Sequence, residues 1–224
     1  MSILDTFYSR AYENDINKKM LYYNYVFPTE EVESYVRQIL CVPVERFIQR
    51  DIELETTEVI TPKDVFQFSS LEVITDHICC VLNEVGNPGV TFIQAGKMLL
   101  KDGIIRKDGA YIKYGENHLK TAEALGLLYD LAHTYFVSCI GMVYYNFTEE
   151  ERFKLTVRLF LRNKFIVRLL KAASKGKVDA RQFLYMLSDS TYIRRKSNIK
   201  CILRYLLTSS EYDFSDIINN IYFS

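Results

Sequence analysis

The chain has no tryptophan, only 4 prolines and no long apolar run. No segment approaches the roughly 20 uncharged apolar residues that a membrane-spanning helix needs. The first residues lack the basic start and apolar run of a secretory signal peptide. Apolar residues make up 49% and charged residues 25% of the 224 residues, which is typical of a globular protein with a core. We therefore expect a cytoplasmic protein that does not associate with membranes.

The sequence signatures of common enzymes are also missing. There is no Gly-x-Ser-x-Gly, no phosphate-binding loop and no dinucleotide-binding Gly-x-Gly-x-x-Gly. The histidines are few, far apart and outside any metal-ligand spacing, namely His77, His118 and His133. The cysteines are odd in number and lie in apolar runs, which indicates reduced, buried thiols: Cys41, Cys79, Cys80, Cys139 and Cys201. We expect neither a metal nor a cofactor.

A nuclease remains an alternative because of the acidic residues between Phe47 and Ile60. This segment alternates partly and is rich in β-branched residues, which predicts one or two strands. Metal-dependent nucleases often place Glu-x-Lys on a strand after an upstream aspartate. Here Glu53 and Glu55 follow Asp51, but the lysine is missing. An enzyme is therefore the less favoured hypothesis.

The zero net charge hides an uneven distribution of charged residues. Residues 148–210 contain 15 basic and 5 acidic side chains, whereas residues 1–68 contain 7 and 12. Residues 69–147 contain 6 and 8, and residues 211–224 contain 0 and 3. A basic block of this kind suggests a polyanionic partner. Docking of the basic block on the acidic N-terminal part is the alternative.

Residues 1–68 predict a small N-terminal α/β region of unknown role. Leu4–Tyr25 fits a helix or an irregular arm. A clearer helix begins at Thr29, has acids in its first turn and ends before Pro43. Its apolar face consists of Val32, Tyr35, Val36 and Ile39.

Residues 69–147 predict a first winged-helix-like unit. Helices are expected at Leu71–Val85, Phe92–Leu100 and Tyr111–Leu125, with Gly126 as a C-cap. A β-hairpin is expected at Leu127–Val137. Three short helices followed by a hairpin are the plan of a winged helix-turn-helix, whose third helix meets DNA.

Residues 148–224 predict a second unit of the same plan. A capping box at Thr148–Glu151 opens a helix to Leu161, and helices at Phe165–Ala173 and Ala180–Leu187 follow. A basic helix is expected at Asp189–Leu207, with Arg and Lys in its first turns and apolar residues after them. The tail, residues 212–223, alternates and is expected to form a second hairpin wing. The fold class is thus mainly α, with tandem winged helix-turn-helix-like units.

The segments KYGENHLKTAEALGLL and LSDSTYIRRKSNIKCILRYL carry a resemblance to a known kind of module. Together they resemble the paired winged-helix DNA-binding modules found beside bacterial restriction and other defence systems. The resemblance covers about residues 69–224. It implies double-stranded DNA as the partner and an effector, often a nuclease, attached or encoded nearby. No effector motif accompanies it here.

Two sets of side chains are predicted to contact DNA. Arginine suits this role because its planar fork bonds guanine or clamps phosphate. On the basic helix we expect Thr191 and Arg195 at bases and Arg194, Lys196 and Lys200 at phosphates. Ser190 and Tyr192 complete the set that is expected to bind DNA. In the first unit the equivalent set is Lys113, Asn117, His118 and Lys120. A protein-interaction module, either homodimeric or an adaptor, is the alternative.

Overall fold

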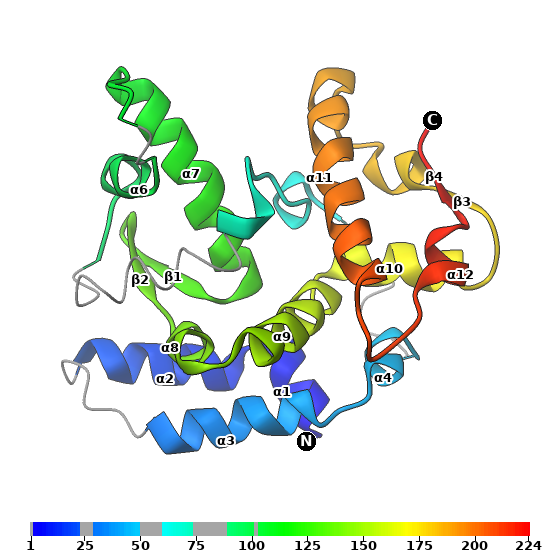
Figure 1. The fold of residues 1–224 in the computed structure, drawn as a ribbon, viewed down its shortest axis with the longest axis horizontal. Coiled ribbons are helices and arrows are strands. Elements are labelled where there is room, and N and C mark those ends of the chain that lie inside the picture. Colours follow the sequence, from blue (N-terminus) through cyan, green and yellow to red (C-terminus); the bar gives the residue numbers. More distant parts are fainter. Residues whose placement is uncertain (1, 23–28, 50–59, 74–88, 101–102) are drawn as a thin grey trace. The chain divides into compact units, whose positions relative to one another are not determined.

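A computed structural model describes residues 2–22, 29–49, 60–73, 89–100 and 103–224 (Figure 1). The described chain is mainly helical, as the apolar periodicity predicts, and contains two small two-stranded sheets. It divides into two compact units that are each discontinuous in sequence. Unit 1 comprises residues 1–41 and 68–155, and unit 2 comprises residues 42–67 and 156–224. This division differs from the three consecutive segments expected from the sequence.

The first part of unit 1 is a set of helices from its two chain segments. Helices α1 (Ile3–Ser9), α2 (Ala11–Tyr22) and α3 (Thr29–Leu40) are joined by α8 (Cys139–Asn146), which packs on α2 and α3. Asn17 of α2 accepts a hydrogen bond from the backbone N–H of Cys139 at 2.9 Å. The predicted apolar face of α3 is confirmed, since Val32, Val36 and Ile39 are buried. The expected α/β character of this region is wrong for its described residues, because they form no strand.

This part of the chain contains two segments with a stated expectation and one helix that was not expected. Phe47 belongs to helix α4 (Val44–Gln49), so a strand does not begin there, and residues 50–59 lie outside the described part. Most of the expected helix Leu71–Val85 also lies outside it. Helix α8 was not predicted, because its run of apolar and aromatic residues has no clear period. Ser138 caps it by accepting a hydrogen bond from Gly141 at 3.0 Å.

The second part of unit 1 contains two helices and a hairpin. They are α6 (Phe92–Leu99), α7 (Asp108–Leu125), β1 (Leu128–Leu131) and β2 (Thr134–Val137). The strands pair antiparallel, with Leu128 opposite Val137, as predicted. Gly126 ends α7 in the left-handed conformation, at a φ of 85°, which is the expected C-cap. The predicted helices were correct here, except that α7 begins three residues earlier.

Helix α9 (Glu149–Leu161) contains the boundary between the two units, after Leu155. It begins at the predicted capping box. The backbone N–H and hydroxyl of Thr148 both donate to Glu151 at 2.9 Å, and the Glu151 N–H donates back to Thr148 Oγ1 at 3.3 Å. Two orphan N–H groups are thereby satisfied at the helix start.

The core of unit 2 is formed by side chains from both of its chain segments. Its elements are α4, the 3₁₀ turn η2 (Pro62–Asp64), the end of α9, α10 (Lys164–Ala173), β3 (Val178–Asp179), η4 (Ala180–Leu184), α11 (Asp189–Leu207), α12 (Ser215–Ile218) and β4 (Ile221–Tyr222). The rings of Phe66 and Phe160 meet edge to face at 5.8 Å. The fully buried Arg158 donates to both carboxylate oxygens of Glu211, at 2.7 and 3.1 Å.

The predicted second hairpin is wrong. The tail forms α12 and then β4, which pairs parallel with β3 through Val178–Ile221 and Asp179–Tyr222. Asp213 accepts a hydrogen bond from the Ser215 N–H at 2.9 Å and starts the short helix. The apolar residues Ile217, Ile218 and Ile221 have a spacing that fits a helical turn as well as alternation. The expected helix from Ala180 is a 3₁₀ helix that ends at Leu184, with Asp179 as its cap, as predicted.

Candidate nucleic-acid interface

Helices α6 and α7 approach each other closely because glycines line their contact (Figure 1). A Cβ atom on Gly96 would lie 2.0 Å from the carbonyl oxygen of Tyr111. A Cβ atom on Gly115 would lie 2.0 Å from the carbonyl oxygen of Phe92. Real Cβ atoms do not approach a backbone oxygen so closely. Any other residue at these positions would therefore move the helices apart.

The hairpin follows α7 directly and is tied to the segment before α6. Val90 and Tyr135 exchange both backbone hydrogen bonds, at 2.9 and 2.8 Å, so β2 is paired on both sides. The hairpin turn places Ala132 and His133 at φ values of 50° and 66°, as a type I′ turn requires. Asp130 supports the turn by accepting a hydrogen bond from the His133 N–H at 2.8 Å. Helix, turn, helix and hairpin thus form one connected assembly.

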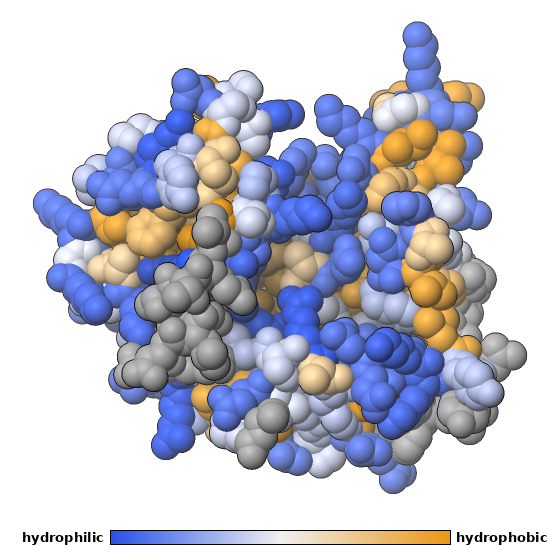
Figure 2. Space-filling model, turned by 180° about the vertical axis from the view of Figure 1, so that it is seen from behind, coloured by the Kyte–Doolittle hydropathy of each residue, from blue (hydrophilic) through white to orange (hydrophobic). Residues whose placement is uncertain are grey.

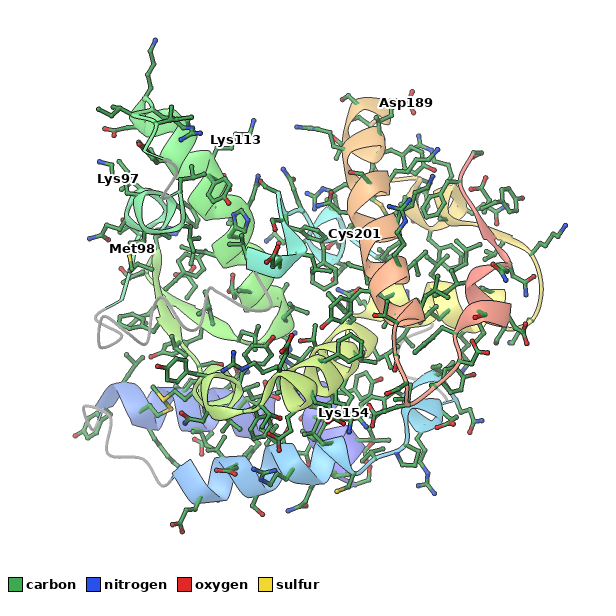
Figure 3. The ribbon with its side chains drawn as sticks, in the orientation of Figure 1. Lys97, Met98, Lys113, Lys154, Asp189 and Cys201 are labelled. Carbon is green, nitrogen blue, oxygen red and sulfur yellow. The ribbon has the colours of Figure 1, made fainter. Side chains whose placement is uncertain are left out.

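The residues predicted on α7 differ in exposure. Lys113 and Lys120 are exposed, and Asn117 is partly exposed. Figure 3 shows Lys113 on α7 and Lys97 on α6. Lys120 lies 3.4 Å from Glu116, an exposed pair that contributes little to stability. Two lysines of this set are therefore accessible to a partner.

His118 was predicted to face outward, and this is wrong. It is fully buried, and its Nδ1 lies 2.8 Å from the carbonyl oxygen of Tyr114. Its ring stacks obliquely on the Tyr114 ring at 4.2 Å between centroids. Burial lowers the pKa of His118, although the hydrogen bond to Tyr114 opposes this. His118 is therefore a neutral core residue that cannot contact DNA in this conformation.

The exposed face of α11 carries part of the predicted basic set. Ser190, Arg194 and Lys200 are exposed, and Thr191 is partly exposed. The guanidinium of Arg194 folds back along the helix, 3.3 Å from the carbonyl oxygen of Ser190. Arg204 lies on the same face, one turn beyond Lys200, and the sequence interpretation missed it. Its signal was its position four residues after Lys200. Figure 3 marks this helix by Asp189 at its start and Cys201 in its second half.

Three residues of the predicted set are hydrogen-bonded to backbone carbonyl groups of unit 2. Tyr192 is 5% exposed, and its hydroxyl donates to the carbonyl oxygen of Ser224 at 3.0 Å. Arg195 is half-buried and donates to the carbonyl oxygen of Val65. Lys196 donates to the carbonyl oxygen of Phe223 at 3.2 Å. Tyr192 is buried, so its predicted contact with DNA is wrong, whereas Arg195 and Lys196 are partly exposed and their contact with DNA stays a prediction.

The reason lies in helical geometry. Tyr192, Arg195 and Ile199 are spaced three and four residues apart, so they share the stripe that buries Ile202 and Leu206. Burial lowers the pKa of Arg195, and the neighbouring Arg194 lowers it further. A guanidinium with partial burial needs its backbone acceptor, which ties α11 to the segment that contains Val65.

Asp179 lies beside the same tail. Burial alone would raise the pKa of Asp179, but hydrogen bonds from Ser224 and Arg181 outweigh it, and Lys196 adds to them. The pKa of Asp179 is therefore below its ordinary value. The ionised carboxylate accepts the N–H groups of Ser224 at 3.3 Å and Arg181 at 2.9 Å. It thus links the tail to the start of η4.

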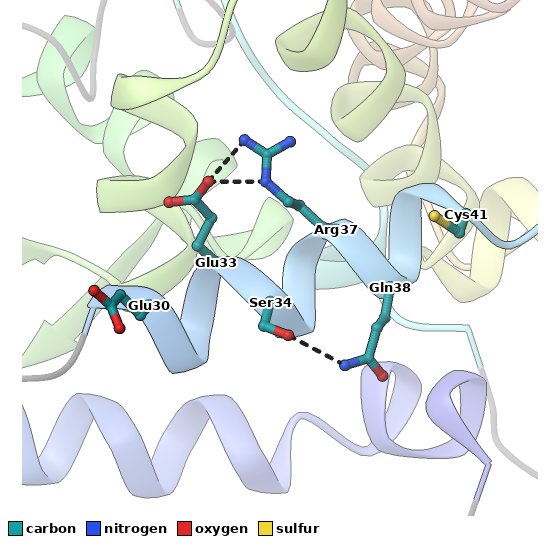
Figure 4. Close-up of a pocket in the computed structure, with 6 residues that line it drawn as sticks. All are labelled: Glu30, Glu33, Ser34, Arg37, Gln38 and Cys41. Carbon is teal, nitrogen blue, oxygen red and sulfur yellow. Dashed lines mark hydrogen bonds and ion pairs between the residues drawn. The ribbon is translucent and has the colours of Figure 1, made fainter.

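A shallow depression of about 560 Å³ lies along α3 (Figure 4). Its lining comes from this helix and the residue that follows it: Glu30, Glu33, Ser34, Arg37, Gln38 and Cys41. Arg37 is engaged by Glu33 at 2.7 Å and by Glu151 at 2.8 Å. Hydrogen bonds that Arg37 donates to Glu151 and Glu33 raise the pKa of Arg37. Arg37 is the one basic residue of this lining and already pairs with two carboxylates, which gives no indication of a ligand site.

Within the described ranges, no group of three His, Cys, Asp or Glu side chains could hold a metal ion. The acids of the nuclease hypothesis, Asp51, Glu53 and Glu55, lie outside those ranges. None of the described helices is both long and apolar enough to span a membrane. No family model, no curated protein and no solved structure matches this chain.

Proposed function

We propose that this chain binds double-stranded DNA. The winged-helix-like assembly of α6, α7 and the β1–β2 hairpin would be one contact, and the exposed basic face of α11 another. The observation that carries the proposal is the connected assembly in unit 1, in which α7 leads directly into a hairpin paired on both sides. In winged helix-turn-helix proteins, the helix that precedes the hairpin and the hairpin itself reach the grooves of DNA. Here that helix is α7.

The charges of the exposed residues support the proposal. Lys113 and Lys120 lie on α7, and Arg194, Lys200 and Arg204 lie on α11. Side chains of this type release counterions from the phosphate backbone, which supplies most of the non-specific affinity of DNA-binding proteins. The association with restriction or defence systems, which the sequence resemblance implies, extends this proposal and stays a prediction.

The first experiment is a fluorescence anisotropy titration with a labelled duplex over a series of salt concentrations. Replacing Lys113, Arg194 or Lys200 by Ala should weaken binding and reduce the slope of log affinity against log salt by about 1 each. These side chains are exposed, so the melting temperature should not change. Lys18→Ala, which removes an exposed lysine from α2, is the matched control and should bind as the unaltered protein does.

Arg195→Ala should behave differently from Arg194→Ala. It removes a donor that is bonded to Val65, so it should lower the melting temperature of the protein.

Absence of binding to any duplex at low salt would disprove the proposal. If the Lys113, Arg194 and Lys200 variants bind DNA as tightly as the unaltered protein does, α7 and α11 are not the DNA contacts.

A further inference from the structure

Two adjacent isoleucines are exposed in the connection between α6 and α7. Ile105 is 95% exposed and Ile104 is 59% exposed, and Ile112 on α7 is 41% exposed. We call Ile104 and Ile105 the isoleucine tip. Figure 2 shows apolar surface at the end of unit 1 where this connection lies. Exposing an isoleucine forfeits the favourable free energy of its burial, so an exposed pair suggests a partner.

The connection is held in one conformation by hydrogen bonds. The Tyr111 hydroxyl donates to the carbonyl oxygen of Ile104 at 3.2 Å and accepts from the Arg106 N–H at 3.2 Å. The Arg106 guanidinium also donates to the Ile104 carbonyl oxygen, at 3.1 Å. These bonds restrain the backbone on either side of Ile105. The isoleucine tip therefore needs little further ordering when it binds.

Basic residues outnumber acidic residues in the sequence on both sides of the isoleucine tip. Among the described residues from 97 to 114, the basic residues are Lys97, Arg106, Lys107 and Lys113, and the one acid is Asp108. Asp108 lies 3.5 Å from Lys97. An excess of positive charge around an apolar pair fits a polyanion that also offers an apolar surface. Stacked base pairs between phosphates have both properties.

We propose that the isoleucine tip is a wedge that enters duplex DNA at a base step and bends it. This inference rests on the proposed function and adds a deformation of the DNA to it. Apolar side chains of this kind partly unstack a base step, most easily at pyrimidine–purine steps. The exposed surface of two isoleucines is too small for a stable protein interface, which buries about 800 Å² on each partner. A few apolar side chains are also a weak anchor for a lipid surface.

The test combines binding and bending. The full chain is titrated into a duplex with fluorophores at both ends, and into one with 2-aminopurine at a central TA step. Energy transfer should report bending, and 2-aminopurine fluorescence should rise on unstacking. The double variant Ile104→Ser with Ile105→Ser should lose both signals and roughly ten-fold in affinity, with an unchanged salt slope. The matched control is Tyr22→Ser, which removes a large exposed apolar side chain at the end of α2.

The outcomes separate this inference from the proposed function. If the protein binds the duplex without bending or unstacking it, the wedge is disproved and DNA binding stands. If no duplex is bound at low salt, the proposed function fails, and the wedge with it. Vesicles of anionic lipid are the second arm. Flotation with such vesicles that the double variant abolishes, without any DNA signal, would assign the isoleucine tip to a lipid surface and overturn the wedge.

Discussion

At the scale of single residues, burial separates the basic side chains that can bind a partner from those that hold the fold. Arg194 and Arg195 are neighbours in the sequence, yet one is exposed and the other donates to the backbone of Val65. A helix turns by about 100° at each residue, so adjacent side chains point in different directions. The charge of a segment therefore overestimates the charge that a partner meets.

His118 makes stability depend on pH. Burial holds the pKa of His118 below its ordinary value of 6.5, so the folded protein resists protonation that the unfolded chain accepts. Above pH 6.5 the ring is neutral in both the folded and the unfolded state, so it does not change the free energy of unfolding. Below pH 6.5 the unfolded chain binds a proton more readily than the folded protein, so the free energy of unfolding falls. The loss should reach at most about 1.4 kcal/mol for each pH unit. Urea unfolding at a series of pH values between 7.5 and 5 measures it.

One variant isolates this contribution. His118→Leu should flatten the pH dependence between pH 6.5 and 5, because it removes the titrating ring. A His118→Leu protein with the same pH profile as the unaltered chain would contradict the prediction.

At the scale of elements, glycine decides how α6 and α7 pack. A methyl group on Gly115 would collide with the carbonyl oxygen of Phe92, whereas nothing lies within 4 Å of a Cβ atom on Gly109. Both glycines belong to α7, so alanine replaces glycine in the same helix at both sites. The two substitutions therefore differ mainly in the tertiary surroundings of the new methyl group. They form a matched pair for testing the crossing.

Gly115→Ala should destabilise the protein by roughly 2–3 kcal/mol, because the two helices must separate. Gly109→Ala should change stability by less than about 1 kcal/mol and in the favourable direction, because alanine restricts the unfolded chain. Urea unfolding measures both. If α7 contacts DNA, Gly115→Ala should also weaken binding in the anisotropy titration. Equal stability of the two variants would show that the helices do not cross so closely.

At the scale of the whole molecule, the chain leaves unit 1, enters unit 2, returns and leaves again. Unit 2 therefore depends on a segment far from its main part. Val44, Phe47, Val65 and Phe66 are buried, and all come from residues 42–67. Asn163 also donates to the carbonyl oxygen of Asp64 at 2.9 Å.

A fragment of residues 148–224 should therefore lack a cooperative thermal transition, because its apolar partners are missing. Joining residues 42–67 through a flexible linker to residues 156–224 should restore one. Circular dichroism melting and dispersion of amide proton shifts check both fragments. Cooperative melting of residues 148–224 alone would support the consecutive segments that the sequence suggested.

The sequence by itself determined most of the local structure. Apolar periodicity and capping residues predicted α3, α6, α9, α10 and α11, because these signals act within a few residues. Two short extended segments after the Gly126 C-cap predicted the β1–β2 hairpin. Helix α8 and the parallel pairing of β3 with β4 were missed, because an apolar run and a two-residue strand carry little local signal.

Tertiary structure alone decided which side chains remain available. It placed His118 and Tyr192 inside, used Arg195 and Lys196 to hold distant backbone oxygens, and left Ile104 and Ile105 exposed. The physical reason is that burial depends on residues far away in sequence, such as Val65 and Phe223. Local periodicity specifies the face of a helix, whereas the segments that cover that face come from the whole chain.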